Sequence, residues 1–285
     1  YDSNDYIACI SKVTHDIVET VAPDTDSSYL PHAVDSEVFK PLPEENITAL
    51  KENSNLNDNK FTIFWNNRNA RRKQSGSLIF WFAKFLDKVG KDKARLIMHT
   101  EPKDPNGPDL VAQINKLGLT NGEVQFSKEK IIPSQLAAIY NIADVTVNIS
   151  DAEGFGLATL ESLSCGTPII VNMTGGLQEQ VTDGENWFGV GIEPSSKAVI
   201  GSQDIPYIYE DRINEDDFVD ALEKIYNMSK KERQALGLSG RDHVLKNYNF
   251  KNFQISWQAL IQDVLEKFGS WENRKGYKTW ELTEV

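Results

Sequence analysis

The stretch ADVTVNISDAEGFGLATLESLSCGTPIIV, residues 143–171, decides the fold that we predict for this chain. It contains a β-rich run at 144–149, a loop with two glycines, a helical pattern at 156–165 and a second β-rich run at 168–171. This order of elements is typical of a βαβ unit, in which the helix crosses the sheet and the two strands run parallel.

The same alternation extends toward the amino terminus. Further β-rich runs lie at 61–65, 94–98 and 123–126, and helical patterns lie between them at 76–89, 108–117 and 133–142. Alternating strands and helices predict an α/β fold with a Rossmann-like parallel sheet flanked by helices. In such a sheet the ligand is expected at the carboxyl ends of the strands.

Outside this array the pattern is less regular. We expect a strand at 6–10, a helix at 12–21, a short strand and turn at 30–35, and a linker with one or two helical turns at 41–59. Helical patterns resume at 214–228, 229–247 and 250–268. The irregular segment 193–212 is too long for a simple connection, and we interpret it as a functional loop.

The composition excludes several classes of protein. The chain has 285 residues and a formal net charge of −12, so its overall field repels nucleic acids and anionic membranes. Cys9 and Cys165 are too few for a disulfide framework, and we expect both to be buried and reduced. The longest apolar run, 78–83, is far shorter than the ~20 residues of a membrane span. We therefore predict a soluble, cytoplasmic protein with no transmembrane segment and no nucleic-acid partner.

The loop at 150–156 has the features of an anion site. Gly154 and Gly156 let a ligand approach the backbone, and the amides of Phe155, Gly156 and Leu157 lie at the positive end of the helix that follows. Phosphate is the natural ligand of such a site. The alternative is an ordinary glycine-rich β–α turn.

Two carboxylates flank these amides. Glu161 lies inside the helix, where a carboxylate cannot serve phosphate but can accept paired hydrogen bonds from vicinal hydroxyls. Glu153 precedes the helix and is placed to meet hydroxyls at the other end of the ligand. The alternative is that both are incidental surface glutamates.

A basic cluster, RNARRK at 68–73, follows the first strand of the array. Its four cations stand out on an acidic protein, and the carboxyl end of a strand directs them to the same cleft as the glycine loop. We interpret the cluster as one side of a clamp on a diphosphate. A solvated charged face is the alternative.

Together these residues resemble the carboxy-terminal, nucleotide-sugar-binding domain of retaining GT-B glycosyltransferases, specifically glycosyltransferase family four. The family's Glu, seven residues, Glu motif matches Glu153 and Glu161, and its Arg, four residues, Lys pair matches Arg68 and Lys73. Supporting matches are the Pro-His-Ala-Val-Asp turn at 31–35, the strand entry at 143–145, the Cys-Gly-Thr-Pro segment at 165–168 and the Gly-Gly pair at 175–176.

The resemblance implies a role for each residue. Arg68 and Lys73 neutralise the donor diphosphate, Glu161 holds the ribose hydroxyls, and Glu153 positions the transferred sugar together with the amides of Phe155 and Gly156. The implied reaction transfers a sugar from a UDP- or GDP-sugar to a sugar, lipid or protein acceptor with retention of configuration. It needs no metal, no enzymic nucleophile and no cofactor beyond the donor.

The chain departs from the family in one large way, because only about thirty residues precede the turn that joins the two domains. The resemblance implies a remnant of the amino-terminal acceptor domain at 1–30, an interdomain turn and linker at 31–60, the nucleotide-sugar domain at 61–248, and a crossing helix with a tail at 249–285. Either the chain is a fragment or a second chain supplies the missing half. The apolar face of the final helix is then left exposed.

Other readings are weaker. A non-catalytic nucleotide-sugar-binding subunit that needs a separate acceptor-binding chain is the main alternative, and a sugar-phosphate hydrolase or epimerase lacks evident acid and base residues. Asp24-Thr25-Asp26 has the form of a metal-diphosphate chelate but lies in a polar loop. His15, His99 and His243 have no partners at ligand spacing, and the aromatic run 80–85 is interpreted as core.

Overall fold

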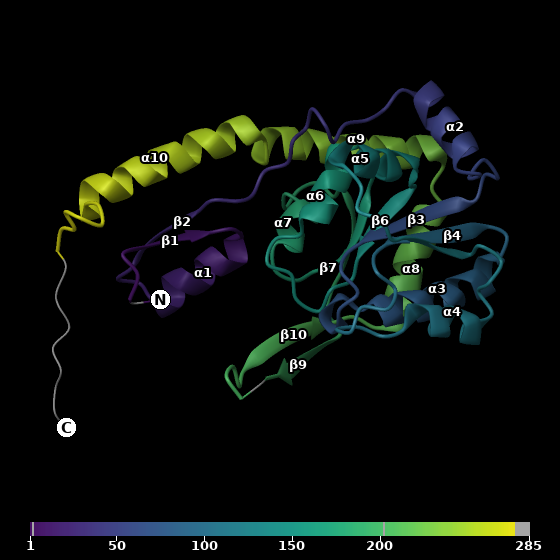
Figure 1. The fold of residues 1–285 in the computed structure, drawn as a ribbon, viewed down its shortest axis with the longest axis horizontal. Coiled ribbons are helices and arrows are strands. Elements are labelled where there is room, and N and C mark those ends of the chain that lie inside the picture. Colours follow the sequence, from purple (N-terminus) through teal and green to yellow (C-terminus); the bar gives the residue numbers. More distant parts are fainter. Residues whose placement is uncertain (2, 202, 277–285) are drawn as a thin grey trace.

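The computed structural model describes residues 1, 3–201 and 203–276. Its centre is a six-stranded parallel sheet with the strand order β5-β4-β3-β6-β7-β8 (Figure 1). The strands are β3 (Phe61–Asn66), β4 (Ala94–His99), β5 (Val124–Ser127), β6 (Val145–Asn148), β7 (Ile169–Asn172) and β8 (Gly189–Ile192). The predicted Rossmann-like parallel sheet is confirmed.

Helices cover both faces of the sheet. One face carries α3 (Ser75–Val89), α4 (Leu110–Leu117) and α8 (Glu215–Tyr226), and the other carries α5 (Pro133–Ile142), α6 (Leu157–Ser164), α7 (Leu177–Val181) and α9 (Lys230–Asn247). The helix α2 (Glu44–Asn53) packs on α5. Six of these helices begin within two residues of the expected positions, namely α3, α4, α5, α6, α8 and α9.

Side-chain alternation along the strands divides the core in two. From β3, Ile63 and Trp65 point into the cluster under α3 and α8, whereas Phe64 points into the cluster under α5 and α6. All five residues from Phe61 to Trp65 are buried, as expected of a strand covered on both faces. Phe82 and Phe85 lie in this core as predicted, but Phe80 of the same aromatic run is 43% exposed.

The strand order reverses between β3 and β6. The chain moves outward from β3 to β4 and β5, then returns to place β6 on the other side of β3. At such a switch point the loops leave the carboxyl ends of two neighbouring strands in opposite directions and a crevice remains between them. Both motifs selected from the sequence follow these two strands.

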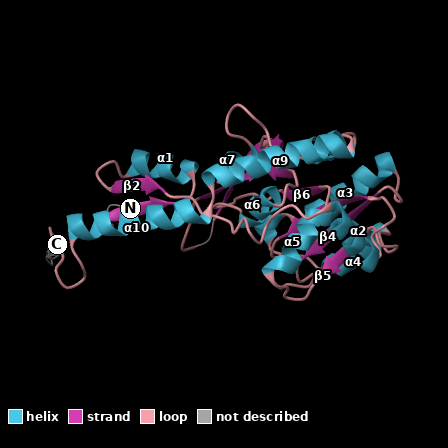
Figure 2. Cartoon of the chain, turned by 90° about the horizontal axis from the view of Figure 1, so that it is seen from above, coloured by secondary structure: helices cyan, strands magenta, loops and turns pink. Residues whose placement is uncertain are grey.

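A small amino-terminal unit lies apart from the sheet. It consists of β1 (Tyr6–Cys9), α1 (Lys12–Val21) and β2 (Asp26–Tyr29), with the two strands paired in parallel. The helix α10 (Phe250–Phe268) extends from the sheet domain and runs alongside this unit (Figure 2), where Lys267 forms an ion pair with Asp26. None of the α10 residues is buried, and Phe250, Ile255 and Ile261 are about half exposed, so the expected open apolar face is present.

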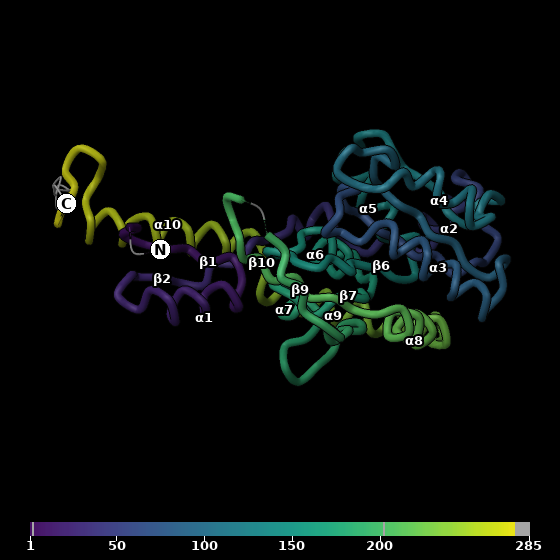
Figure 3. The backbone as a smooth tube through the Cα atoms, turned by 90° about the horizontal axis from the view of Figure 1, so that it is seen from below, coloured from purple at the N-terminus to yellow at the C-terminus, as the bar shows by residue number. Residues whose placement is uncertain are grey.

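Four expectations need correction. The strands β2 and β8 were missed because β2 is polar and β8 has glycine, which is depleted in strands, at positions 189 and 191. The segment 193–212 contains an antiparallel hairpin, β9 (Ser196–Ile200) and β10 (Ile208–Arg212), which projects toward the side of the amino-terminal unit (Figure 3). The linker 41–59 holds the ten-residue helix α2, and 30–35 contributes a single bridge, between Val34 and Asn249.

Two other observations complete the fold. Cys9 and Cys165 are buried free thiols, as expected. Among the described residues, no helix is long and apolar enough to cross a lipid bilayer.

We predict that Gly189→Ala destabilises the sheet. A Cβ atom at this position would lie 1.9 Å from the carbonyl oxygen of Ile169, so β7 and β8 must separate. The free energy of unfolding should fall by about 1–3 kcal/mol, as for other overpacked sites. Urea unfolding of Gly154→Ala is the matched control, because its Cβ would have no contact shorter than 3.6 Å. Equal unfolding midpoints for the two variants would contradict this prediction.

Candidate functional site

The loops after β3 and β6 meet at the switch point. The first contains the short 3₁₀ helix η1 (Arg71–Lys73), and the second runs from Ile149 to Gly156. They are joined directly, since the amide of Asp151 donates to the carbonyl oxygen of Arg72 at 2.8 Å. The two sequence motifs therefore lie side by side and make up one candidate site.

The glycine loop ends at the N-terminus of α6. Gly156 adopts φ 92°, a left-handed conformation that favours glycine, and a Cβ there would lie 2.5 Å from Leu177 Cδ2. The first amides of α6, like those of any α-helix, have no intrahelical partner, and no side chain caps them. Gly154 and Leu157 are exposed beside them. This geometry leaves backbone donors available to a ligand.

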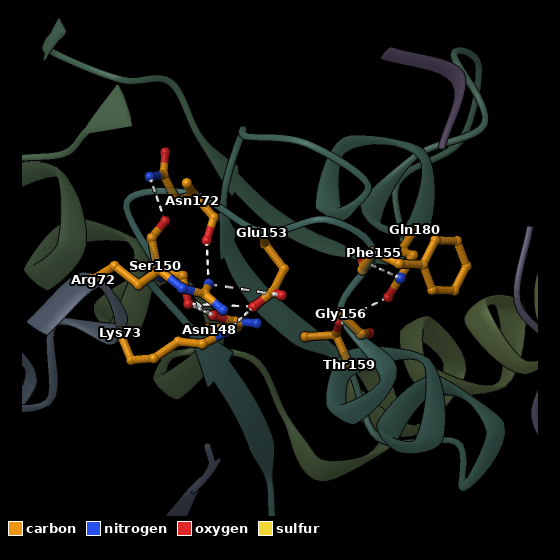
Figure 4. A network of polar contacts seen from close by, with 11 residues as sticks. Arg72, Lys73, Asn148, Ser150, Glu153, Phe155, Gly156, Thr159, Asn172 and Gln180 are labelled. Carbon is orange, nitrogen blue, oxygen red and sulfur yellow. Dashed lines mark hydrogen bonds and ion pairs between the residues drawn. The ribbon is translucent and has the colours of Figure 1, made fainter. Parts of the chain in front are cut away.

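A buried ion pair connects the two loops. Lys73 Nζ donates to Glu153 Oε2, and the two side chains are only 10% and 12% exposed (Figure 4). Burial lowers the pKa of Lys73, although the Glu153 carboxylate opposes this shift. Arg72 lies on the same side, where it donates to the carbonyl oxygen of Ala152 at 2.6 Å. Ser150 Oγ also approaches Glu153, at 3.5 Å.

The basic cluster 68–73 is divided among separate partners. Arg68 donates twice to Asp104, at 2.7 and 3.2 Å, and this contact holds the pKa of Asp104 well below its usual range. Arg71 makes a bidentate contact with Glu210, at 2.5 and 2.9 Å. The cations thus do not form one uncompensated patch, because each arginine or lysine of the cluster has an oxygen partner.

The hairpin supplies site residues that sequence reasoning missed. Glu210 of β10 is 2% exposed and also accepts from Arg212, while the amide of Asp211 donates to the carbonyl oxygen of Asp151. The signal for this hairpin in the sequence was weak, because its strands SKAVI (196–200) and IYEDR (208–212) each contain only two β-forming residues. The base of β9–β10 is therefore fixed to both loops of the site.

Glu161 lies deeper than its neighbours. Its carboxylate accepts a hydrogen bond from the Tyr140 hydroxyl at 2.8 Å, and the side-chain amide of Asn66 donates to the same hydroxyl at 2.9 Å. Burial raises the pKa of Glu161 to about 7, against the opposing effect of the Tyr140 hydrogen bond. The sequence placed Glu161 one turn and a half into the helix but gave no sign of this buried partner.

The Gly-Gly pair approaches the glycine loop closely. A Cβ at Gly175 would lie 1.7 Å from the carbonyl oxygen of Glu153, and the amide of Gly176 donates to that oxygen at 3.3 Å. Next along the chain, Gln180 of α7 donates to the carbonyl oxygen of Phe155 and accepts from Thr159, both at 2.7 Å (Figure 4). The segment 175–180 thus holds the glycine loop from behind.

A group of possible metal ligands lies on the amino-terminal unit. His15, Asp16 and Glu19 have ligand atoms within 4.8 Å of one another, so the expectation that His15 lacks neighbours at ligand spacing is wrong. Asp16 and Glu19 are exposed, and exposed groups of this kind are common without a metal. Asp26 of the Asp-x-Asp segment instead forms an ion pair with Lys267.

The fold and the arrangement of the two loops define a GT-B glycosyltransferase domain of the carboxy-terminal type. The chain belongs to the family of glycosyl transferases group 1, whose profile matches residues 46–243.

Relatives support this placement. The chain is 25% identical over 181 residues to alpha-monoglucosyldiacylglycerol synthase of Streptococcus pneumoniae, covering 63% of this chain and 40% of that protein. It is 29% identical over 177 residues to D-inositol 3-phosphate glycosyltransferase of an Arthrobacter species, covering 56% of this chain and 35% of that protein. The chain therefore spans less than half the length of these relatives.

Solved structures have the same fold. Sucrose-phosphate synthase from Thermosynechococcus elongatus superposes with a TM-score of 0.75 at 20% identity, over 93% of this chain and 60% of that chain. Anabaena Alr3699/HepE in complex with UDP-glucose gives a TM-score of 0.70 at 16% identity, over 90% and 63%. The C-terminal domain of the group 1 protein LpcC from Francisella tularensis gives 0.56 at 21% identity, over 76% and 99%.

We predict that Tyr140→Phe raises the pKa of Glu161 further above about 7. The phenol donates to the carboxylate and favours its charged form, and the variant removes this donor while keeping the ring in the core. A ¹³C NMR titration of the glutamate carboxyl carbons measures the shift. Tyr226→Phe, on the opposite face of the sheet, is the control. A lower pKa in Tyr140→Phe would contradict the role given to this hydrogen bond.

Proposed function

We propose that this chain is the donor-binding part of a retaining, metal-independent glycosyltransferase that uses a UDP- or GDP-sugar. The observation that carries the proposal is the Lys73–Glu153 pair at the uncapped N-terminus of α6. A cation, free backbone amides and a carboxylate are the groups that a nucleotide diphosphate and its sugar require at one place.

The diphosphate would bind between η1 and α6. Lys73 meets it from one side and the first amides of α6 from the other, and Arg68 turns from Asp104 to join them. A cation about 4 Å from a phosphate oxygen, at an effective dielectric near 20, contributes about 4 kcal/mol. Two such cations can take the place of a metal ion as negative charge develops on the departing diphosphate.

The two glutamates bind hydroxyl groups. Glu161 exchanges its contact with Tyr140 for the ribose hydroxyls, and Glu153 orients the transferred sugar with the amides of Phe155 and Gly156. Transfer breaks the bond between the sugar C1 and the diphosphate oxygen and forms a bond from C1 to the acceptor oxygen on the same face. The acceptor proton passes to the leaving phosphate oxygen, so the protein supplies no nucleophile.

A direct test is calorimetric titration of the chain with UDP, GDP and their sugars. The proposal expects one of the two diphosphates to bind, and absence of binding by both would overturn it. Assaying the chain alone for transfer to an acceptor separates a complete catalyst from a nucleotide-sugar-binding subunit that needs an acceptor-binding chain.

We predict that Arg68→Ala and Lys73→Ala each lower kcat/KM of the complete enzyme by about 100-fold or more, close to 3 kcal/mol of transition-state stabilisation. Steady-state kinetics with the donor sugar measure the effect. Lys84→Ala removes an exposed cation from α3 and is the control. Unchanged turnover in the two site variants would remove both residues from the diphosphate clamp.

We predict that Glu153→Gln binds the nucleotide diphosphate about threefold to tenfold more tightly but loses transfer. The variant frees Lys73 from its carboxylate and removes a negative charge next to the incoming phosphates, which favours an anionic ligand. Titration with the diphosphate alone and a transfer assay measure the two effects. Weaker binding of the diphosphate would show that Glu153 does not compete with it for Lys73.

We predict that Glu161→Ala weakens nucleotide binding by about 1–3 kcal/mol, the contribution of two hydrogen bonds to hydroxyls. Because the pKa of Glu161 is about 7, wild-type affinity should also fall as the pH drops from 8 to 6 and the carboxylate is protonated. Titrations at several pH values measure both effects. Equal affinity of wild type and variant would exclude the ribose role.

A further inference from the structure

The carboxylate of Glu179 bridges the sheet domain and the amino-terminal unit. It lies on α7, is only 8% exposed, and accepts two hydrogen bonds from residues more than 140 positions away in sequence. The backbone amide of Lys12 donates to Oε2 and the phenol of Tyr29 donates to Oε1, both at 2.8 Å. No part of the proposed chemistry uses this residue.

These contacts suit a carboxylate. Lys12 begins α1, whose first amides have no intrahelical partner, and a negative charge at the N-terminus of a helix is stabilised by its dipole. Burial raises the pKa of the Tyr29 phenol, so that this group remains a donor. Lys12 also places its ammonium group 5.9 Å from the ring centre of Tyr29. The amino-terminal unit is therefore held at two points, one on α1 and one on β2.

The backbone of Glu179 is fixed on its other side. Its carbonyl oxygen accepts from His243 at 3.0 Å and from Tyr248 at 3.1 Å. Tyr248 in turn packs edge-on against Phe155 of the glycine loop, with ring centroids 5.8 Å apart, and His32 also packs edge-on against Phe155, at 5.3 Å. Residues of the interdomain turn, α7 and the glycine loop thus form one packed cluster.

The neighbouring residue on α7 contacts the donor site. Gln180 donates to the carbonyl oxygen of Phe155 and accepts from Thr159, Gly175 lies against the backbone of Glu153, and Gly176 lies against that of Gly154 and Phe155. Figure 1 shows α7 on the side of the domain that faces α1. A shift of α7 therefore moves both Glu179 and the backbone that holds Glu153.

We propose that Glu179 is a positioning residue that couples the orientation of the amino-terminal unit to the donor loop through α7. Its carboxylate holds α1 and β2 in place, and Gln180 and the Gly175–Gly176 turn transmit that placement to residues 153–156. The link to donor binding rests on the function proposed above, whereas the role of Glu179 in fixing the amino-terminal unit does not.

The test compares Glu179→Gln, Tyr29→Phe and a control in the same chain. An amide side chain has one acceptor oxygen, so Glu179→Gln leaves one of the two donors without a partner while keeping the volume. Tyr29→Phe removes one hydrogen bond from the other side. Glu123→Gln is the matched control, because Glu123 is 4% exposed and accepts from the amide of Asn121, at the opposite end of the strands.

Hydrogen exchange measured by mass spectrometry reports the local contacts. We expect amides in 6–21 and in 151–157 to exchange about tenfold faster in Glu179→Gln, and less so in Tyr29→Phe, with no change in either segment for Glu123→Gln. Affinity for the nucleotide diphosphate that wild type binds should fall about threefold to tenfold in Glu179→Gln and stay unchanged in the control. A purely structural role would lower the unfolding midpoint without this selective loss.

The outcomes separate the two proposals. Faster exchange in 6–21 with unchanged exchange in 151–157 and unchanged affinity would overturn the coupling. Unchanged exchange in both segments would also overturn the claim that Glu179 fixes the amino-terminal unit. If wild type binds neither UDP nor GDP, the proposed function fails, and the exchange measurements alone then decide whether Glu179 couples the two segments.

Discussion

The reversal of strand order between β3 and β6 is the constraint on which the site depends. Parallel strands need crossover connections, and each helix covers the face of the sheet rather than its end. Where the direction of winding changes, the loops after two adjacent strands diverge and leave their backbones open to a ligand. In this chain those loops are the basic segment after β3 and the glycine loop after β6, and the amide of Asp151 ties one to the other.

The electrostatics of the site follow from this placement. In a chain with a net charge of −12 carboxylates outnumber cations, and the cations of the crevice have carboxylate partners. Asp104, Glu210 and Glu153 pair with Arg68, Arg71 and Lys73, so the free site is close to neutral. Binding of an anion there is an exchange of partners. Such an exchange needs less desolvation than the burial of a new charge would, because Lys73 is already removed from water.

The sequence predicted most of the sheet domain because local patterns there agree with the tertiary environment. The buried strands β3, β4 and β7 are mostly apolar, and helices such as α4 begin at a capping residue, Asp109. The strands that were not predicted are those whose local pattern does not reflect the tertiary environment. The polar strand β2 is stabilised by pairing with β1, and β8 depends on close approach of Gly189 to Ile169, neither of which leaves a periodic signal. The hairpin β9–β10 was hidden in a segment with no core-facing pattern.

By itself the sequence determined the βαβ order, the family resemblance and the identity of the residues at the two loops, because these depend on spacing along the chain. Only the tertiary structure decided how those residues are paired. Lys73 and Glu153, Tyr140 and Glu161, Arg71 and Glu210, and Glu179 with Lys12 and Tyr29 are separated by 21 to 167 positions in sequence. Such partners are chosen by the packing of helices on the sheet, which no local pattern records.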